Sequence, residues 1–268
     1  MNLPSQKPAN PIWHSLADKC IWITGGAGYL GSAITAALDR CCRKVVCFDL
    51  PGRSDSLVAQ SRLERTVPIS LDVAETSAIL REIDSVIDSH GLPDGIAYLA
   101  TSTSRGRSLL SLTAGEFGST FERGLTPTFV FCRALAERMK LRGSGSFVLF
   151  ASMYGMVAPD PRIYRPPMTP NPIDYGAAKA ALIQLMRYFA VHYGPDGLRF
   201  NCVTPGAFPN HDVQKSEPQL INELSQKAAL GRIGDNSEIV GPTLFLLADS
   251  ASFVTGHSLV VDGGWTAW

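Results

Sequence analysis

Tyr175 and Lys179, four residues apart in the stretch DYGAAK, are of types that could carry out proton chemistry. Residues at i and i+4 lie on one face of a helix, so the phenol and the ammonium would be neighbours there. A free phenol titrates near a pH of about 10, and an adjacent ammonium favours its ionised form. The same spacing also occurs on ordinary amphipathic helices, so the pair needs support from the rest of the chain.

A glycine-rich stretch, TGGAGYLG at residues 24–31, follows a short apolar run. Gly25, Gly28 and Gly31 recur at every third position. A turn without Cβ atoms lets backbone N–H groups approach a diphosphate, and the positive end of the following helix faces the same group. Between an apolar strand and an alanine-rich helix, this pattern indicates dinucleotide binding rather than a plain structural turn.

The second apolar run ends at Asp49, 18 residues after Gly31 (49 − 31). A carboxylate at this spacing accepts hydrogen bonds from the adenosine ribose and repels a 2′-phosphate, which favours NAD over NADP. Arg53 lies close enough to keep NADP as an alternative, and a simple turn role at the strand end is the structural alternative for Asp49. Asp72 ends the third apolar run, where it could accept from the adenine amino group.

Apolar runs alternate with helical patterns along the chain. The expected strands are 20–24, 44–48, 67–71, 95–99, 146–150, 198–203 and 258–261, and the expected helices are 27–38, 75–89, 117–142, 175–193 and 238–247. This alternation predicts an α/β protein with a Rossmann-type, doubly wound parallel sheet and helices on both faces. We expect an N-terminal extension at 1–19 and a single dinucleotide-binding catalytic domain at 20–268.

Composition excludes several classes of function. Lys and Arg number 24, as do Asp and Glu, so no basic surface for nucleic acid is indicated. No apolar run reaches the roughly 18 residues of a membrane span, and the N-terminus has no signal-peptide core. None of the six cysteines forms a C-x-x-C pair. We therefore expect no metal, reduced thiols and a cytoplasmic location.

The order and spacing of these motifs resemble the short-chain dehydrogenase/reductase family from about Cys20 to Gly264. Further matching segments are FASMYG around Ser152, RFNCVTPG at 199–206 and VTGHSLVVDGG at 254–264. The resemblance implies a nicotinamide-dependent oxidoreductase (EC 1.1.1.-) that assembles as a homotetramer or homodimer. The subgroup that the chain looks most like is that of bacterial sugar-modification enzymes, such as those of nonulosonic (legionaminic-type) acid pathways.

The resemblance also implies roles for individual residues. Tyr175 would be the general acid/base, Lys179 would favour its phenolate and bind the nicotinamide ribose, and Ser152 would donate to the substrate oxygen. The residues that the motifs and the resemblance together assign to the cofactor are Thr24, Gly25, Gly28, Tyr29, Leu30, Gly31, Asp49, Leu50, Asp72, Val73, Ala100, Thr101, Pro205, Gly206 and Phe208.

Four features depart from the family pattern. The middle glycine of the turn is Gly28 rather than residue 29, which is Tyr29. The family's NNAG after the fourth strand reads YLAT here, with Ala100 as its one match, and Gly124 stands where the family has a catalytic Asn. The fourth departure is a proline-rich insertion at 157–173, which cannot be a helix or a central strand. Three residues of the insertion, Arg162, Tyr164 and Arg165, could bind an anionic or hydroxyl-rich substrate. Two more candidate substrate contacts, Asn210 and His211, lie in an expected mobile loop at 209–213.

The sequence therefore predicts an NAD-dependent enzyme that transfers hydride between nicotinamide and a secondary alcohol or ketone of a sugar or polyol derivative. The spacing of the glycines keeps a sugar (nucleotide) epimerase or dehydratase with non-consumed NAD as an alternative. Gly124 and the lost NNAG keep a non-catalytic dinucleotide-binding protein as a second alternative. Net formation of NADH with a sugar would exclude the first of these.

Overall fold

The computed structural model describes residues 15–102, 104, 106–166 and 168–268. All pairings between its strands are parallel, and together they form a single seven-stranded sheet in the order β3-β2-β1-β4-β5-β6-β7. The strands are β1 (Cys20–Thr24), β2 (Lys44–Asp49), β3 (Thr66–Ser70), β4 (Gly95–Tyr98), β5 (Gly145–Phe150), β6 (Leu198–Pro205) and β7 (Ser258–Val261). The predicted doubly wound α/β fold in one domain is confirmed.

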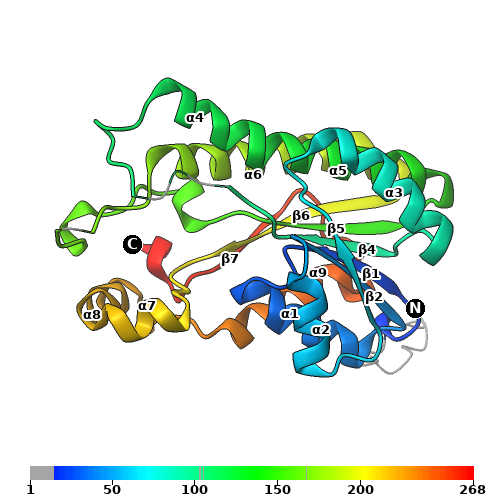
Figure 1. The fold of residues 1–268 in the computed structure, drawn as a ribbon, viewed down its shortest axis with the longest axis horizontal. Coiled ribbons are helices and arrows are strands. Elements are labelled where there is room, and N and C mark those ends of the chain that lie inside the picture. The colour runs from blue at the N-terminus through cyan, green and yellow to red at the C-terminus, as the bar shows by residue number, and fades with distance from the viewer. Residues whose placement is uncertain (1–14, 103, 105, 167) are drawn as a thin grey trace, which may run out of the picture.

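Helices cover both faces of the sheet because each face is apolar (Figure 1). Alternate residues of β1 point to opposite sides, so Trp22 joins one core while Ile21 and Ile23 join the other. The first core is closed by α3 (Thr76–His90), α5 (Thr126–Met139) and α6 (Ile173–Tyr193), and the second by α1 (Tyr29–Cys41) and α9 (Val240–Leu247). Leu16, which precedes β1, is already fully buried in the second core.

Several helices differ from the expectation. The single helix expected at 117–142 is α4 (Ala114–Thr120), a π-helical turn at Phe121–Leu125, and α5. Three further helices were not expected: α2 (Arg53–Ser61), α7 (His211–Ser216) and α8 (Pro218–Lys227). The segment expected as a mobile loop at 209–213 thus begins a helix. No helix in the described part of the chain is both long and apolar enough to span a membrane.

A small lobe stands beyond the end of the sheet where its strands have their carboxyl ends (Figure 1). It consists of the proline-rich insertion, α7, α8 and the C-terminal residues. Five buried side chains, which we call the lobe cluster, hold these parts together: Met153, Tyr154, Ile163, Leu224 and Trp265. The insertion is therefore packed against the rest of the protein through Ile163, which is 4% exposed.

Candidate active site

The glycine turn leads directly from β1 into α1. Gly25 has φ +68°, which favours glycine, and its N–H donates to the carbonyl of Phe48 at 2.8 Å. A Cβ at Gly31 would lie far inside contact distance of the Gly25 carbonyl, so the turn requires a glycine there. The first N–H groups of α1 have no partner within the helix, and they point along its positive end toward the turn. The turn can therefore bind a phosphate group through its backbone.

Asp49 is buried at the end of β2 beside this turn. Its carboxylate accepts hydrogen bonds from the N–H groups of Ala27 at 2.8 Å and Leu50 at 2.9 Å. Arg53 Nη1 lies 3.5 Å from the same carboxylate, with its side chain half exposed. The carboxylate thus fixes the glycine turn, and a cation stands next to the position where the adenosine ribose is expected.

Ser152, Tyr175 and Lys179 come together because two backbone segments approach very closely. A Cβ at Gly155 would lie 2.7 Å from the carbonyl carbon of Lys179, and one at Gly176 would lie 2.8 Å from the carbonyl oxygen of Tyr154. Only glycines allow this approach of the segment after β5 to α6. The glycine of DYGAAK therefore has a structural reason that the sequence pattern alone did not reveal.

Each of the three groups has a defined local environment. Ser152 is 7% exposed, and its Oγ accepts from the Tyr154 N–H at 3.2 Å, which leaves the hydroxyl proton able to donate. Lys179 Nζ lies 5.7 Å from the centroid of the Tyr175 ring and donates to the carbonyl of Phe150 at 2.7 Å. Burial lowers the pKa of Lys179 from 10.5 to about 8. The pKa of the Lys179 ammonium is thus shifted toward neutral pH, and the group lies beside the phenol of Tyr175.

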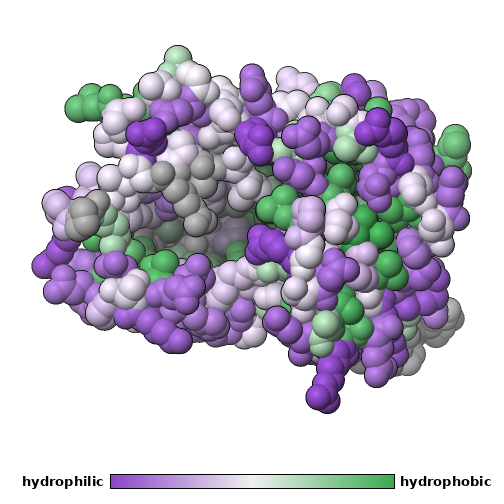
Figure 2. All heavy atoms as spheres, in the orientation of Figure 1, coloured by the Kyte–Doolittle hydropathy of each residue, from purple (hydrophilic) through white to green (hydrophobic). Residues whose placement is uncertain are grey.

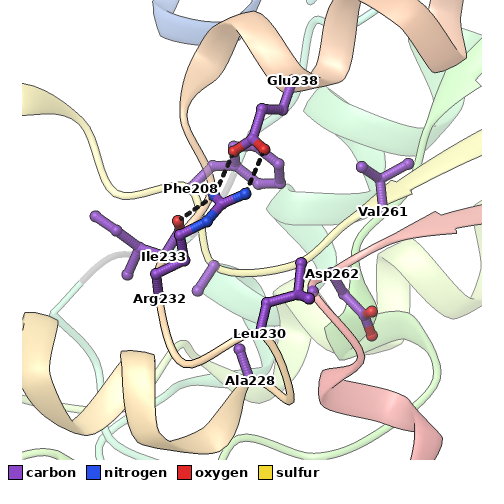
Figure 3. Close-up of a pocket in the computed structure, with 11 residues that line it drawn as sticks. Phe208, Ala228, Leu230, Arg232, Ile233, Glu238, Val261 and Asp262 are labelled. Atoms are coloured by element: carbon purple, nitrogen blue, oxygen red, sulfur yellow. Dashed lines mark hydrogen bonds and ion pairs between the residues drawn. The ribbon is translucent and has the colours of Figure 1, made fainter.

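The segment after β6 lies across from these residues and is held from behind. The Gly234 N–H donates to the Ala207 carbonyl at 2.9 Å, and the ring of Phe208 packs against Gly234 so closely that no Cβ would fit. Arg232 pairs with Glu238 through two bonds of 2.7 Å, and Figure 3 shows this pair beside Phe208. A cavity of about 100 Å³ lies behind the segment. These contacts fix the backbone of 205–208 at the cleft.

A cleft of about 1150 Å³ joins all these parts. Figure 2 shows the hollow on the side of the lobe, with a largely hydrophilic rim. Ligand pockets usually hold about 300–1,000 Å³, so the space suffices for a dinucleotide and a small substrate. Ser152, Tyr175 and Lys179 line it, as do all the residues expected to bind the cofactor except Thr24. Thr24 is fully buried, and its Oγ1 accepts from the N–H of Ala100 at 3.5 Å.

The candidate substrate residues divide into two groups. Tyr164 and Asn210 line the cleft, and the Asn210 side chain also caps α7 by accepting from the Val213 N–H at 3.0 Å. Arg162, Arg165 and His211 are not among the described residues that line it.

Each of the last three has a partner elsewhere. Arg162 binds Asp160 through two bonds of 2.8 Å, and Arg165 lies 3.7 Å from Glu223 on α8. The His211 ring packs edge-on against Tyr29, with the ring centroids 5.2 Å apart. Both arginines therefore lie beside carboxylates and outside the set of residues that line the cleft, and their role in substrate binding stays a prediction.

Several lining residues were missed by the sequence reasoning. Most are apolar, and the charged or aromatic ones include Arg123, Tyr154 and Glu217. Arg123 lies 3.9 Å from Asp72, whose carboxylate also accepts from the Ala74 N–H at 2.9 Å. Tyr154 stood in the quoted FASMYG motif, but no spacing rule distinguished it from a core tyrosine.

Gly124 lies in the π-helical turn between α4 and α5, and its carbonyl accepts from the Thr128 hydroxyl at 2.9 Å. Close by, Asp174 is fully buried one residue before Tyr175. It accepts from Thr120 and from Ser104, the latter through both N–H at 3.2 Å and hydroxyl at 2.8 Å. Burial alone would raise the pKa of Asp174, but these hydrogen bonds outweigh it and lower the pKa. Asp174 thus ties the start of α6 to α4.

The donor set fits a dinucleotide and offers little to a metal. The glycine turn supplies backbone N–H groups without Cβ atoms. Asp49 ends β2, and Asp72 follows the adjacent strand β3 along the same cleft. Among the described residues, no group of three or more His, Cys, Asp or Glu side chains could hold a metal ion.

Comparison with known proteins agrees with this geometry. The family model described as Enoyl-(Acyl carrier protein) reductase matches residues 27–266. The 3-oxoacyl-[acyl-carrier-protein] reductase FabG of Chlamydia trachomatis is 28% identical, over 93% of this chain and 98% of its own. The probable galactose dehydrogenase GalD of Rhizobium meliloti is 26% identical, over 98% and 99%.

Among solved structures, a short-chain dehydrogenase from Leptospira borgpetersenii with bound NAD+ has 27% sequence identity and a TM-score of 0.83. The match covers 99% of this chain and 100% of that one. Sequence, fold and the arrangement of the cleft thus agree, and the chain belongs to the short-chain dehydrogenase/reductase family of oxidoreductases.

Proposed function

We propose that the protein is an NAD-dependent dehydrogenase that transfers hydride between nicotinamide and a secondary alcohol or ketone of a sugar or polyol derivative. The observation that carries this proposal is the meeting of Ser152, Tyr175 and Lys179 in the cleft that begins at the glycine turn. The relative from Rhizobium meliloti, named as a probable galactose dehydrogenase, supports the substrate class.

The bound nicotinamide would supply the hydride chemistry, and the protein would bind, orient and move the proton. Ser152 Oγ donates to the substrate oxygen and holds it toward Tyr175. Tyr175 takes the hydroxyl proton during oxidation and returns it during reduction. The Lys179 ammonium stabilises the phenolate and so keeps the tyrosine basic enough near neutral pH.

The cofactor and the assembly belong to the same proposal. Asp49 at the end of β2 supports NAD, because its carboxylate repels a 2′-phosphate. Exposed apolar side chains on α5 and α6, such as Phe129, Tyr188 and Val191, support a homo-oligomer. A dimer or tetramer is expected in light scattering of the purified protein.

Nicotinamide absorbance tests the proposed activity directly. The panel contains sugars, sugar phosphates, polyols, a nonulosonic acid and a 3-oxoacyl thioester, each with NAD and with NADP. We expect net NADH formation with a sugar or polyol. Tyr175→Phe should lower kcat by at least about 100-fold, while Gln60→Ala, at an exposed position of α2, should change nothing.

The two alternatives give different results in the same experiment. An epimerase or dehydratase would convert a sugar without net change in absorbance. A non-catalytic binding protein would bind NAD and turn over no member of the panel. Full activity of Tyr175→Phe would refute the proposed mechanism.

A further inference from the structure

The proline-rich insertion is held in place on two sides of the lobe. Ile163 is buried in the lobe cluster against Leu224 and Trp265. Asp160 in the insertion lies 2.7 Å from Lys227 at the end of α8. The conformation of the insertion is therefore fixed by apolar packing and an ion pair, and it carries Tyr164 to one position at the cleft.

At that position Tyr164 meets Tyr154, whose segment follows Ser152. The two phenol oxygens lie 2.9 Å apart, and both side chains line the cleft. Tyr154 is 8% exposed and belongs to the same cluster that Tyr175 packs against. The phenol pair, as we call Tyr154 and Tyr164, thus stands in the part of the cleft that holds the proposed reacting oxygen.

Two phenols joined by one hydrogen bond keep one O–H proton unused by that bond. Each hydroxyl has one proton and two lone pairs, and the mutual bond takes one proton and one lone pair. Asn171, which also lines the cleft, donates toward Tyr154 from its side chain and toward Tyr164 from its backbone N–H. The pair therefore keeps one O–H donor and one acceptor lone pair for a ligand. Burial raises the pKa of both Tyr154 and Tyr164, so both stay protonated through the neutral range. The pair is therefore an uncharged hydrogen-bonding group.

We propose that the phenol pair is a substrate-recognition site that binds a hydroxyl group of the substrate away from the reacting carbon. This inference rests on the proposed function and narrows it, because an uncharged donor and acceptor matches a hydroxyl better than a carboxylate or a phosphate. In the proposed function, the glycine turn binds the cofactor and Tyr175 and Lys179 handle the proton. The phenol pair is therefore assigned to substrate recognition and has no part in the chemical step. A rigid pair loses little entropy when it binds, which favours selectivity.

Kinetics of Tyr154→Phe, Tyr164→Phe and the double variant test the proposal. The probes are D-galactose, ribitol and the panel member with the highest kcat/KM, each with saturating NAD. Each single variant should raise KM about tenfold, the effect of one lost hydrogen bond, with kcat within about twofold. The double variant should resemble the worse single variant, because the two phenols act as one unit.

Deoxy analogues of the active substrate give the sharper readout. The analogue that lacks the recognised hydroxyl should show the same KM with the wild type and with Tyr164→Phe. Thermal unfolding of every variant, with Gln60→Ala on α2 as the exposed control, separates loss of fold from loss of recognition. If Tyr164→Phe fails to fold, Tyr154→Phe alone still answers the question.

The outcomes separate this inference from the proposed function. Full turnover by Tyr175→Phe would overturn the proposed function and the inference with it. An inactive Tyr175→Phe together with unchanged KM in both phenol variants would overturn the recognition site alone. A loss of kcat with unchanged KM would also overturn it, because the pair would then act on the chemical step.

Discussion

Replacing Lys179 by Met should stabilise the protein without cofactor while it abolishes activity. Lys179 is 6% exposed, and burial lowers its pKa from 10.5 to about 8. This shift corresponds to roughly 3 kcal/mol of unfavourable free energy when the ammonium is charged in the folded state. Lys179→Met would remove this penalty, but it would also lose the hydrogen bond to the Phe150 carbonyl, which offsets about 1 kcal/mol of the gain in stability. We therefore expect Lys179→Met to raise the free energy of unfolding by about 2 kcal/mol at pH 7.

The pH dependence of unfolding provides a second test of the predicted stabilisation by Lys179→Met. Below pH 8 the folded and unfolded states both hold the proton, so the folded wild type carries the full penalty. As pH rises from about 8 to 10.5, the folded state releases its proton first and the penalty disappears. The stability difference between Lys179→Met and the wild type should therefore shrink toward pH 10.

Urea denaturation of the apo protein at pH 7 and pH 10 measures both effects. Lys215→Met, at an exposed position of α7, is the matched control and should stay within about 0.5 kcal/mol of the wild type. A variant less stable than the wild type at pH 7, or a difference that does not narrow with rising pH, would refute the reasoning. Activity of Lys179→Met near the wild-type level would contradict the proposed role of the ammonium.

Two further predictions concern the cofactor end of the cleft. Asp49→Ser should raise the NADP-to-NAD ratio of kcat/KM about tenfold or more, because it removes a carboxylate that repels the 2′-phosphate. Arg53→Ala should lower that ratio, and an unchanged ratio in both would contradict the assignment. Gly31→Ala should abolish NAD binding in a fluorescence titration, because its Cβ would collide with the Gly25 carbonyl. Gly28→Ala, whose Cβ would lie 3.2 Å from that carbonyl, should retain more binding.

The strands could be predicted from the sequence because they are short apolar runs. β1 is buried along its whole length and has the predicted bounds, since a parallel strand covered by helices reads as one continuous apolar run. β7 also has the predicted bounds, although its residues are only half-buried. The missed helices lack this signal. In α2 only Ser54 is buried, so that helix presents no apolar stripe to recognise. In α8 the apolar side is limited to Leu220, Ile221 and Leu224, about one turn, which is a short signal for a helix. The π-helical turn escaped because it keeps the composition of a helix while it changes the period.

The candidate site could be predicted in part. The glycine turn and the Tyr175–Lys179 pair depend on local spacing, which a sequence displays directly. Contacts between segments that are distant in the sequence cannot be read from local spacing. Arg165 is held by Glu223 of a helix that the sequence did not predict, so its direction could not be foreseen. Tyr154 and Tyr164 meet only because the insertion packs against α8, and the roles of all these residues toward a cofactor remain predictions.

The order of strands in the sheet has a consequence for how the chain is made. β2 and β3 add in turn to one side of β1, and β4 to β7 add in turn to the other. Each new strand therefore joins an existing edge, and none has to insert between two others as the chain leaves the ribosome. Trp265 of the lobe cluster comes after the last strand. A nascent chain would thus form the glycine turn and Asp49, at the adenosine end of the proposed cofactor site, before Trp265 joins the lobe cluster.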